Sequence, residues 1–276
     1  MKKILVGILT AVAIVAPTQI ATAADERVVA IIDSAIDSTK FSSIVYEACF
    51  TQNKSCPNKT NFMEGKGAAN SPVWPSSMLN TVYHGHSMVA ASVKTNPNIK
   101  IVFVRIADIT SSGSSLNAGQ SLSQAMDWVS KNASKYSIDA LSVSQSRVNW
   151  TTCPTDLLVL NSIKSLNVQN IPTFVSTGND GLADKVGFPA CVDGAVGIGA
   201  VTADGSAFAK ITNRGPGLDA VAVGDMDIVR SNGTTATISG TSVANVVAST
   251  KYVGQTNLLN QFISGFAKFL TYPFIK

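Results

Sequence analysis

Residues 28–37 read VVAIIDSAID, and this stretch decides how the chain is expected to fold. The first half of it is apolar and mostly β-branched, which favours a strand buried on both faces. Asp33 follows directly, so a carboxylate stands at the carboxyl end of that strand. The functional groups of parallel sheets gather at this edge. The stretch therefore predicts a buried strand and the first residue of a functional site.

Apolar runs of the same kind recur along the chain, with longer segments between them. They lie at 101–105, 140–143, 173–176, 196–200 and 220–223. The clearest helix is expected at about 116–130, where apolar residues recur on one face. Strands and helices in alternation predict a single-domain α/β fold with a doubly wound, mostly parallel sheet and helices on both faces. Asp33, Ser144 and Asn179 each come just past an expected strand.

The first 23 residues have the pattern of a signal peptide. Lys2 and Lys3 precede an apolar run at 4–16, and small residues lead up to Ala23, which predicts an exported protein, secreted or periplasmic. The alternative is a membrane anchor, but the run is short for a bilayer, and we expect no stable membrane insertion after cleavage. Cleavage removes both lysines and no acid, so the formal net charge falls from +4 to +2. So small a charge does not indicate nucleic-acid binding.

The remaining residues, 24–276, are expected to form one domain. The whole chain is 45% hydrophobic and 14% charged, which fits a globular protein with an ample core. Residues 49–83 are polar and rich in Asn, Lys, Ser and Pro, which predicts a surface insertion. Residues 250–276 are expected to hold a C-terminal helix that packs on the core, because apolar residues recur there at near-helical spacing. A helix on a membrane surface is the alternative, but it would need a cationic polar face.

The four cysteines are expected to pair, because an exported protein meets an oxidising environment. Cys49 and Cys56 are close in sequence around a polar loop, which makes them the first candidate pair and leaves Cys153 with Cys191. The sequence alone allows three pairings. A zinc site is the competing interpretation, but no C-x-x-C pair and no histidine near a cysteine supports it. We therefore expect no metal site among these residues.

An Asp, a His and a Ser follow one another in the order of a catalytic triad. Asp33 ends the first strand, the only histidines are His84 and His86, and Ser242 lies within SGTSVA at 239–244. That segment places a hydroxyl after a Gly-Thr turn, at the start of a helix-like stretch. Such a constellation is typical of nucleophilic acyl transfer.

Four segments resemble the motifs of the subtilisin-like serine proteases, the subtilase or peptidase S8 family. They are AIIDSAID at 30–37, HGHSMVA at 84–90, STGNDG at 176–181 and GTSVA at 240–244. Residues 188–190, 197–201 and 215–219 also follow the family pattern, so the resemblance covers about 28–249. The resemblance implies a subtilisin-like fold and a serine endopeptidase that hydrolyses peptide bonds through an acyl-enzyme.

The resemblance also assigns roles to residues. It implies that Ser242 attacks the peptide carbonyl, that His84 takes its proton, and that Asp33 orients the imidazole. Asn179 and the backbone N–H of Ser242 would donate to the oxyanion. His86 is the alternative base: choosing His84 keeps the following glycine in register, whereas choosing His86 keeps Ala91 in register.

Peptide substrates of the family bind as an added strand. By resemblance, Ser144, Gln145 and Ser146 provide the edge for that strand, and Thr177 and Gly178 line the first specificity pocket. The family usually has glycines near Gln145 and Ser146, so we expect a narrower groove.

The other wall of that pocket would be 187–189, and a Cys153–Cys191 bridge there would brace both walls. The resemblance allows calcium binding, but no site can be assigned from scattered acids, and no other cofactor is expected. We expect a monomer that acts on a peptide or protein substrate.

Two departures from the family pattern keep a second hypothesis open. Ala35 stands where the family has a glycine, and Val246 stands where it has a proline. The alternative function is an exported, subtilisin-like binding or scaffold protein with weak or no catalysis. An esterase of the α/β-hydrolase type would need G-x-S-x-G, which the sequence does not contain.

Overall fold

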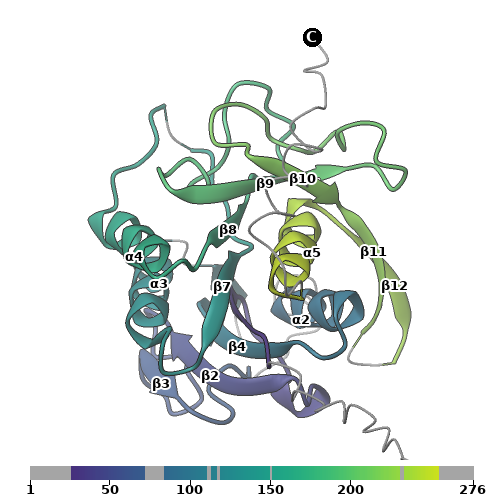
Figure 1. Cartoon of the computed structure of the whole chain (residues 1–276). Helices are drawn as coiled ribbons and strands as arrows, with labels where there is room; N and C mark the ends of the chain where they lie inside the picture. The colour runs from purple at the N-terminus through teal and green to yellow at the C-terminus, as the bar shows by residue number, and fades with distance from the viewer. Residues whose placement is uncertain are drawn as a thin grey trace, which may run out of the picture.

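The computed structural model describes residues 26–71, 84–110, 113–116, 119–149, 151–230 and 233–254 (Figure 1). Three predictions made from the sequence fall wholly or partly outside these ranges. They are the signal peptide at 1–23, the part of the surface insertion from 72 to 83, and the C-terminal helix beyond 254.

An eight-stranded sheet forms the centre of the described structure, in the order β10-β9-β8-β7-β1-β4-β2-β3. All neighbours are parallel except β2 and β3. The strands are β1 (Val28–Asp33), β2 (Ile44–Phe50), β3 (Phe62–Glu64), β4 (Lys100–Arg105), β7 (Ile138–Val143), β8 (Thr173–Ser176), β9 (Ala195–Val201) and β10 (Ala220–Val223). This confirms the mostly parallel α/β sheet and all the strands predicted from apolar runs.

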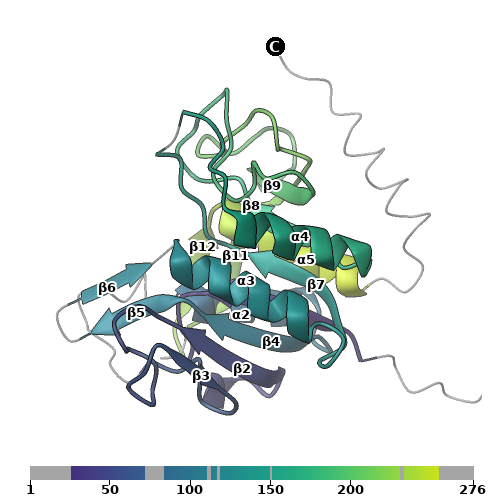
Figure 2. The same ribbon diagram turned by 90° about the vertical axis from the view of Figure 1, so that its left-hand side faces the viewer.

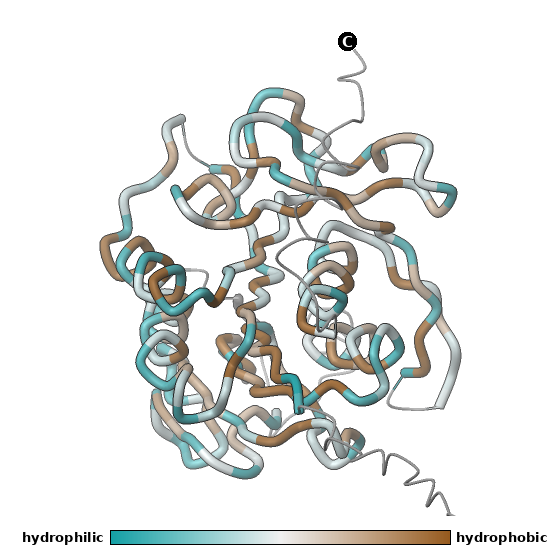
Figure 3. Tube along the Cα trace, viewed as in Figure 1, coloured by the Kyte–Doolittle hydropathy of each residue, from teal (hydrophilic) through white to brown (hydrophobic). Residues whose placement is uncertain are grey.

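Helices cover both faces of this sheet, as predicted. Helices α3 (Gln120–Asn132) and α4 (Leu157–Val168) lie on one face, and α2 (His84–Thr95) and α5 (Thr241–Gly254) lie on the other (Figures 1 and 2). Alternate side chains of β1 join the two cores: Ala30 and Ile32 pack with α3 and α4, whereas Val29 and Ile31 pack with α2 and α5. A strand buried on both faces needs a continuous apolar run, and Figure 3 shows hydrophobic residues along the central strands.

Two small hairpins and one short helix complete the described elements. The hairpins are β5 (Ala107–Thr110) with β6 (Gly113–Leu116), and β11 (Asp225–Val229) with β12 (Thr235–Ser239); the 3-10 helix η1 is Ser38–Lys40. The start of the predicted helix at 116 is therefore wrong. Residues 113–116 pair with β5 instead, and α3 begins only at Gln120, after Gly119. Glycine favours such a break because it adopts backbone conformations that a helix does not use.

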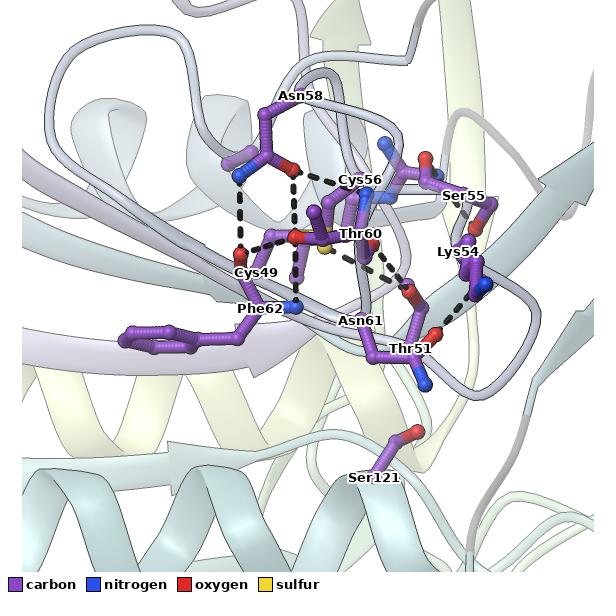
Figure 4. Close-up of a disulfide and its surroundings, with 12 residues drawn as sticks. Cys49, Thr51, Lys54, Ser55, Cys56, Asn58, Thr60, Asn61, Phe62 and Ser121 are labelled. Carbon is purple, nitrogen blue, oxygen red and sulfur yellow. Dashed lines mark hydrogen bonds between the residues drawn. A yellow bond between two sulfur atoms is a disulfide. The ribbon is translucent and has the colours of Figure 1, made fainter.

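Both predicted disulfides are present: Cys49 bonds Cys56, and Cys153 bonds Cys191. The first closes the loop between β2 and β3, where side chains of Thr60 and Asn58 also hold the turn (Figure 4). Cys49 lies in β2 rather than in a loop, so the polar segment begins inside the sheet.

Candidate active site

The predicted functional residues gather because neighbouring parallel strands end at one edge of the sheet. Asp33 is the last residue of β1, Ser144 follows β7, and Asn179 comes shortly after β8. Strand β7 lies between β1 and β8. The first turns of α2 and α5 supply His84 and Ser242.

Asp33 and His84 form the most closely connected pair of this site. The imidazole Nδ1 lies 2.8 Å from Oδ1 and 3.0 Å from Oδ2 of Asp33, whose side chain is fully buried. An ionised carboxylate can only accept, so Nδ1 carries the proton and Nε2 is left as the acceptor. The backbone N–H of Ser34 also donates to Oδ1, at 2.6 Å. These bonds fix the tautomer that a general base needs.

The turn around Gly85 brings α2 close to the end of β1. The Gly85 N–H donates to Ser34 Oγ at 2.9 Å. A Cβ on Gly85 would lie 2.7 Å from Phe103 Cζ and 2.8 Å from the Ala35 carbonyl oxygen. No side chain fits there without displacing the backbone, so the glycine after His84 sets how closely the imidazole approaches Asp33.

Burial lowers the pKa of His84 and is the largest single influence on it. The negative charge of Asp33 and its hydrogen bond raise the pKa and together outweigh burial. The pKa of His84 therefore lies above its ordinary value of 6.5, and the imidazolium formed by proton transfer is stabilised where it arises.

His86 lies in a different environment, although it is only two residues further along α2. Two residues turn a helix by about 200°, so the rings leave it on opposite sides. The His86 ring packs 4.5 Å from the Phe41 ring and is almost fully buried. Burial lowers its pKa, which Asp37 raises and Lys40 lowers. The Asp33 carboxylate is thus paired with His84, the histidine favoured by the motif.

The Ser242 hydroxyl is held by the end of β7. Its Oγ donates to the Ser144 carbonyl at 3.3 Å, and Ser144 Oγ donates to the Ser242 carbonyl at 3.4 Å. No hydrogen bond joins Ser242 to His84 within the part of the chain that is described. Nucleophilic attack would need the hydroxyl to rotate from Ser144 toward the imidazole, a change that substrate binding often brings about.

Asn179 is anchored by one end of its amide. Its Oδ1 accepts from the backbone N–H and from Oγ1 of Thr241, both at 2.9 Å. Thr241 Oγ1 in turn accepts from the Gly178 N–H at 3.2 Å. The Asn179 side chain is exposed, and its NH₂ group has no bond to another described residue. That leaves a donor beside Ser242 for a developing negative charge.

Thr241 and Asn213 position this donor, although neither was assigned a role from the sequence. Asn213 is fully buried; its Oδ1 accepts from the N–H groups of Asp180 and Leu182, and its Nδ2 donates to the Thr177 carbonyl and to Asp180. The one available signal was that Thr241 directly precedes Ser242. Nothing local in the sequence pointed to Asn213.

Another missed residue, Asn245, joins the nucleophile helix to the predicted substrate edge. It lies one helical turn after Ser242, and its Nδ2 bonds Ser142 Oγ at 3.0 Å, the Val143 carbonyl at 3.2 Å and Ser144 Oγ at 3.4 Å. These bonds fix the start of the predicted edge, of which Ser144 and Gln145 are buried.

The two predicted walls of the pocket are joined by backbone hydrogen bonds. Arg147 and Phe188 exchange N–H···O bonds of 3.1 and 2.8 Å, and the Gly187 N–H donates to the Thr177 carbonyl at 2.7 Å. Gly178 has a φ of +104°, a conformation that favours glycine. Thr177, Gly178, Ser146 and 187–189 are thus brought together.

No cluster of three or more His, Cys, Asp or Glu side chains that could hold a metal ion occurs among the described residues. Across the same ranges, no helix has the length and apolar character needed to cross a membrane.

A family model described as "Subtilase family" matches residues 24–253 of this chain. Among solved structures, a protease from Pseudoalteromonas arctica PAMC 21717 superposes with a TM-score of 0.64 and 16% identity, over 82% of this chain and 76% of that one. A mutant of the protease domain of PatA superposes with a TM-score of 0.61 and 16% identity, over 87% of this chain and 81% of that one. The prenylagaramide maturation protease PagA superposes with a TM-score of 0.54 and 19% identity, over 82% of this chain and 73% of that one. No curated protein sequence matched.

Proposed function

The chain belongs to the subtilase family of serine-type peptidases, and from this premise we propose that it is an exported endopeptidase with Ser242, His84 and Asp33 as its catalytic triad. It would hydrolyse peptide bonds of a peptide or protein substrate through an acyl-enzyme. The observation that carries the assignment is the 2.8 Å bond between His84 Nδ1 and the buried Asp33 carboxylate, at the same edge of the sheet as Ser242.

In this mechanism His84 acts first as a base and then as an acid. A serine hydroxyl is a weak nucleophile, so Nε2 of His84 takes its proton as Oγ attacks the peptide carbonyl. Asp33 keeps the imidazole in the required tautomer and stabilises its charged form. The same proton is then given to the leaving amine, and a water molecule repeats the sequence to release the acid.

Asn179 and the backbone N–H of Ser242 would hold the oxyanion. The anchored Oδ1 of Asn179 leaves its NH₂ group to donate. The N–H groups in the first turn of α5 have no partners within the helix, and the helix dipole favours negative charge there. Donors placed before the reaction begins are effective because they need no reorganisation as charge develops.

The substrate would lie along Ser144, Gln145 and Ser146 as an added strand, with Thr177 and Gly178 next to the residue that carries the scissile carbonyl. We propose a monomer, exported after loss of residues 1–23. The two disulfides are consistent with an exported protein. Calcium binding, which the family allows, has no assigned site and no step in this mechanism.

One observation favours the second candidate, a subtilisin-like scaffold protein with little turnover. The Ser242 hydroxyl bonds the Ser144 carbonyl, and a serine held there would not be activated. A fluorophosphonate probe separates the two functions because it reacts only with an activated serine. We expect the folded protein to be labelled on Ser242, and labelling to be lost in Ser242→Ala and His84→Ala but retained in His86→Ala. Loss in His86→Ala alone would move the base to His86, and an unlabelled wild-type protein would favour the scaffold.

A further inference from the structure

The predicted specificity pocket has little space for the side chain of the substrate residue whose carbonyl is attacked. If the oxyanion lies at Asn179 and the attacked carbon at Ser242, the residue that contributes the scissile carbonyl lies beside Gly178 and Ser144. Its side chain must then enter the space between 144–146 on one side and 177–178 on the other, with Gly187 beyond.

Ser146 already occupies this space. A Cβ built on Gly178 would lie 2.9 Å from Ser146 Oγ. A Cβ built on Gly187 would overlap Ser146 Oγ and lie 3.1 Å from Ser146 Cβ. The CH₂OH group of Ser146 therefore projects between the two glycines, whereas the family usually has a glycine near this position.

The walls around Ser146 are held together and resist being spread apart. Arg147 and Phe188 bond each other through their backbones, and the Arg147 guanidinium lies 4.9 Å from the centre of the Phe188 ring. The Cys153–Cys191 disulfide joins the segments that follow the two walls. A large side chain could not enter by separating 146–147 from 187–188 without breaking these bonds.

Two hydroxyl groups of the predicted pocket residues are buried without a hydrogen-bond partner. Ser146 Oγ and Thr177 Oγ1 are both inaccessible to solvent and have no hydrogen-bond partner among the described residues. Buried polar atoms without partners are uncommon and call for an explanation. Packing between Gly178 and Gly187, and not a hydrogen bond, therefore holds the Ser146 hydroxyl in this position.

We propose that Ser146 fills the first specificity pocket and restricts this peptidase to glycine, alanine or serine at the residue whose carbonyl is attacked. The proposal rests on the proposed function and names the substrate class of the same site. Larger side chains are excluded by overlap with the Ser146 side chain, which lies between Gly178 and Gly187. Ser146 thus determines specificity without taking part in the chemical steps.

The test compares peptide substrates that differ only at this residue, with Ala, Ser, Leu or Phe. The kcat/KM of the wild-type protein should be higher for Ala than for Phe by on the order of 100-fold. Ser146→Gly should reduce the Ala-to-Phe ratio at least about 10-fold. Ser134→Gly, which replaces an exposed serine just after α3, is the matched control and should leave the ratio as in the wild type.

The outcomes separate this inference from the function on which it rests. A wild-type protein that reacts with fluorophosphonate but cleaves Phe as fast as Ala overturns the pocket proposal alone. A preference for Ala that Ser146→Gly leaves unchanged overturns the assignment to Ser146. A protein that neither reacts with the probe nor cleaves any peptide overturns both. If Ser146→Gly does not fold, mapping wild-type cleavage sites in a denatured protein by mass spectrometry decides: small residues before the cut support the proposal, and large ones contradict it.

Discussion

Asp33 and Arg105 are register partners at the ends of neighbouring strands β1 and β4, both fully buried and both ionisable. They differ in what their charged groups bond. Asp33 accepts from one backbone N–H, that of Ser34 at 2.6 Å, and from one side chain, the His84 ring at 2.8 Å. The Arg105 guanidinium bonds mainly backbone: the carbonyls of Asn70, Ser55 and Ala107, at 2.5, 2.9 and 3.1 Å, with a longer contact to Ser55 Oγ.

The surroundings of Arg105 fasten the disulfide loop to the sheet. Asp108 accepts from the N–H groups of Gln52 and Asn53 and from Ser55 Oγ. Its carboxylate therefore also binds residues of the disulfide loop. Burial lowers the pKa of Arg105 to about 10, while Asp108 raises it. The guanidinium therefore stays charged at neutral pH, and each of its nitrogens has an acceptor.

The contrast shows how one edge of a sheet can carry both structure and chemistry. Each nitrogen of the Arg105 guanidinium donates to an oxygen of the surrounding segments, and these bonds stabilise one conformation. The site at Asp33 instead contains groups that can still form bonds: Nε2 of His84, the hydroxyl of Ser242 and the NH₂ group of Asn179. Substitutions near Asp33 should therefore change activity, whereas substitutions near Arg105 should change stability.

The largest expected effect is on activity at Ser242. Ser242→Ala removes the nucleophile and should lower kcat by about 10⁶-fold, measured by peptide hydrolysis. The midpoint of thermal unfolding should stay close to that of the wild type, because only one bond to Ser144 is lost. A large fall in the unfolding temperature would mean that Ser242, like Arg105, mainly stabilises the fold.

The next largest effect is on stability at Arg105. Arg105→Met leaves Asp108 and several carbonyl oxygens buried without their cation, and should lower the free energy of unfolding by about 3–5 kcal/mol, measured in urea. Lys100→Met, on the same strand but partly exposed, is the control and should cost no more than about 1 kcal/mol. Equal losses of unfolding free energy in the two variants would mean that the bonds of Arg105 do not stabilise the fold more than an exposed side chain does.

Asn179→Ala should lower kcat by about 10²–10³-fold with little change in KM, because the lost donor acts mainly in the transition state. Asn98→Ala, an exposed asparagine after α2, should change neither constant. A rise in KM with kcat unchanged would instead assign Asn179 to ground-state binding.

Thr241→Val should have a smaller effect, a fall in kcat of about 10-fold. It removes the hydroxyl that bonds Asn179 Oδ1 while the backbone bond from residue 241 remains. Thr241→Ser should restore activity, because it keeps the hydroxyl. If Ser is no better than Val, the hydroxyl does not position Asn179.

The smallest change is expected in the pH profile. The pKa of His84 is raised, and a general base works only when neutral, so kcat/KM should increase with pH through a midpoint above 6.5. The pKa of His86 is lowered, which would place the midpoint below 6.5 if it were the base. His86→Gln should leave the midpoint in place, and a shift in that variant would contradict the choice of His84.

The sequence predicted those parts of the fold whose signal is local. Strands β1, β4, β7, β8, β9 and β10 are apolar runs and were found with small shifts at their ends. Strand β2 was missed because the buried Glu47 interrupts its apolar pattern. That carboxylate accepts from the N–H groups of Gly67 and Ala69, and these partners cannot be read from the strand itself.

The same limit applies to the candidate site. The motifs named Asp33, His84, Asn179 and Ser242, because each lies in a short segment that can be recognised from its own residues. Asn213 and Asn245 were missed because their role consists of hydrogen bonds to segments far away in the sequence. The position of Ser146 between Gly178 and Gly187 likewise requires three segments to be brought together. Only the resemblance pointed to a narrower groove.

The most direct test of the account is a crystal structure of the protein after reaction with a peptidyl phosphonate that carries alanine next to the phosphorus. We predict a bond from phosphorus to Ser242 Oγ, with one phosphonyl oxygen bonded to Asn179 Nδ2 and to the Ser242 N–H. The hydrogen bond between His84 Nδ1 and the Asp33 carboxylate should remain. An unmodified Ser242 still bonded to the Ser144 carbonyl, in protein exposed to excess reagent, would contradict the account.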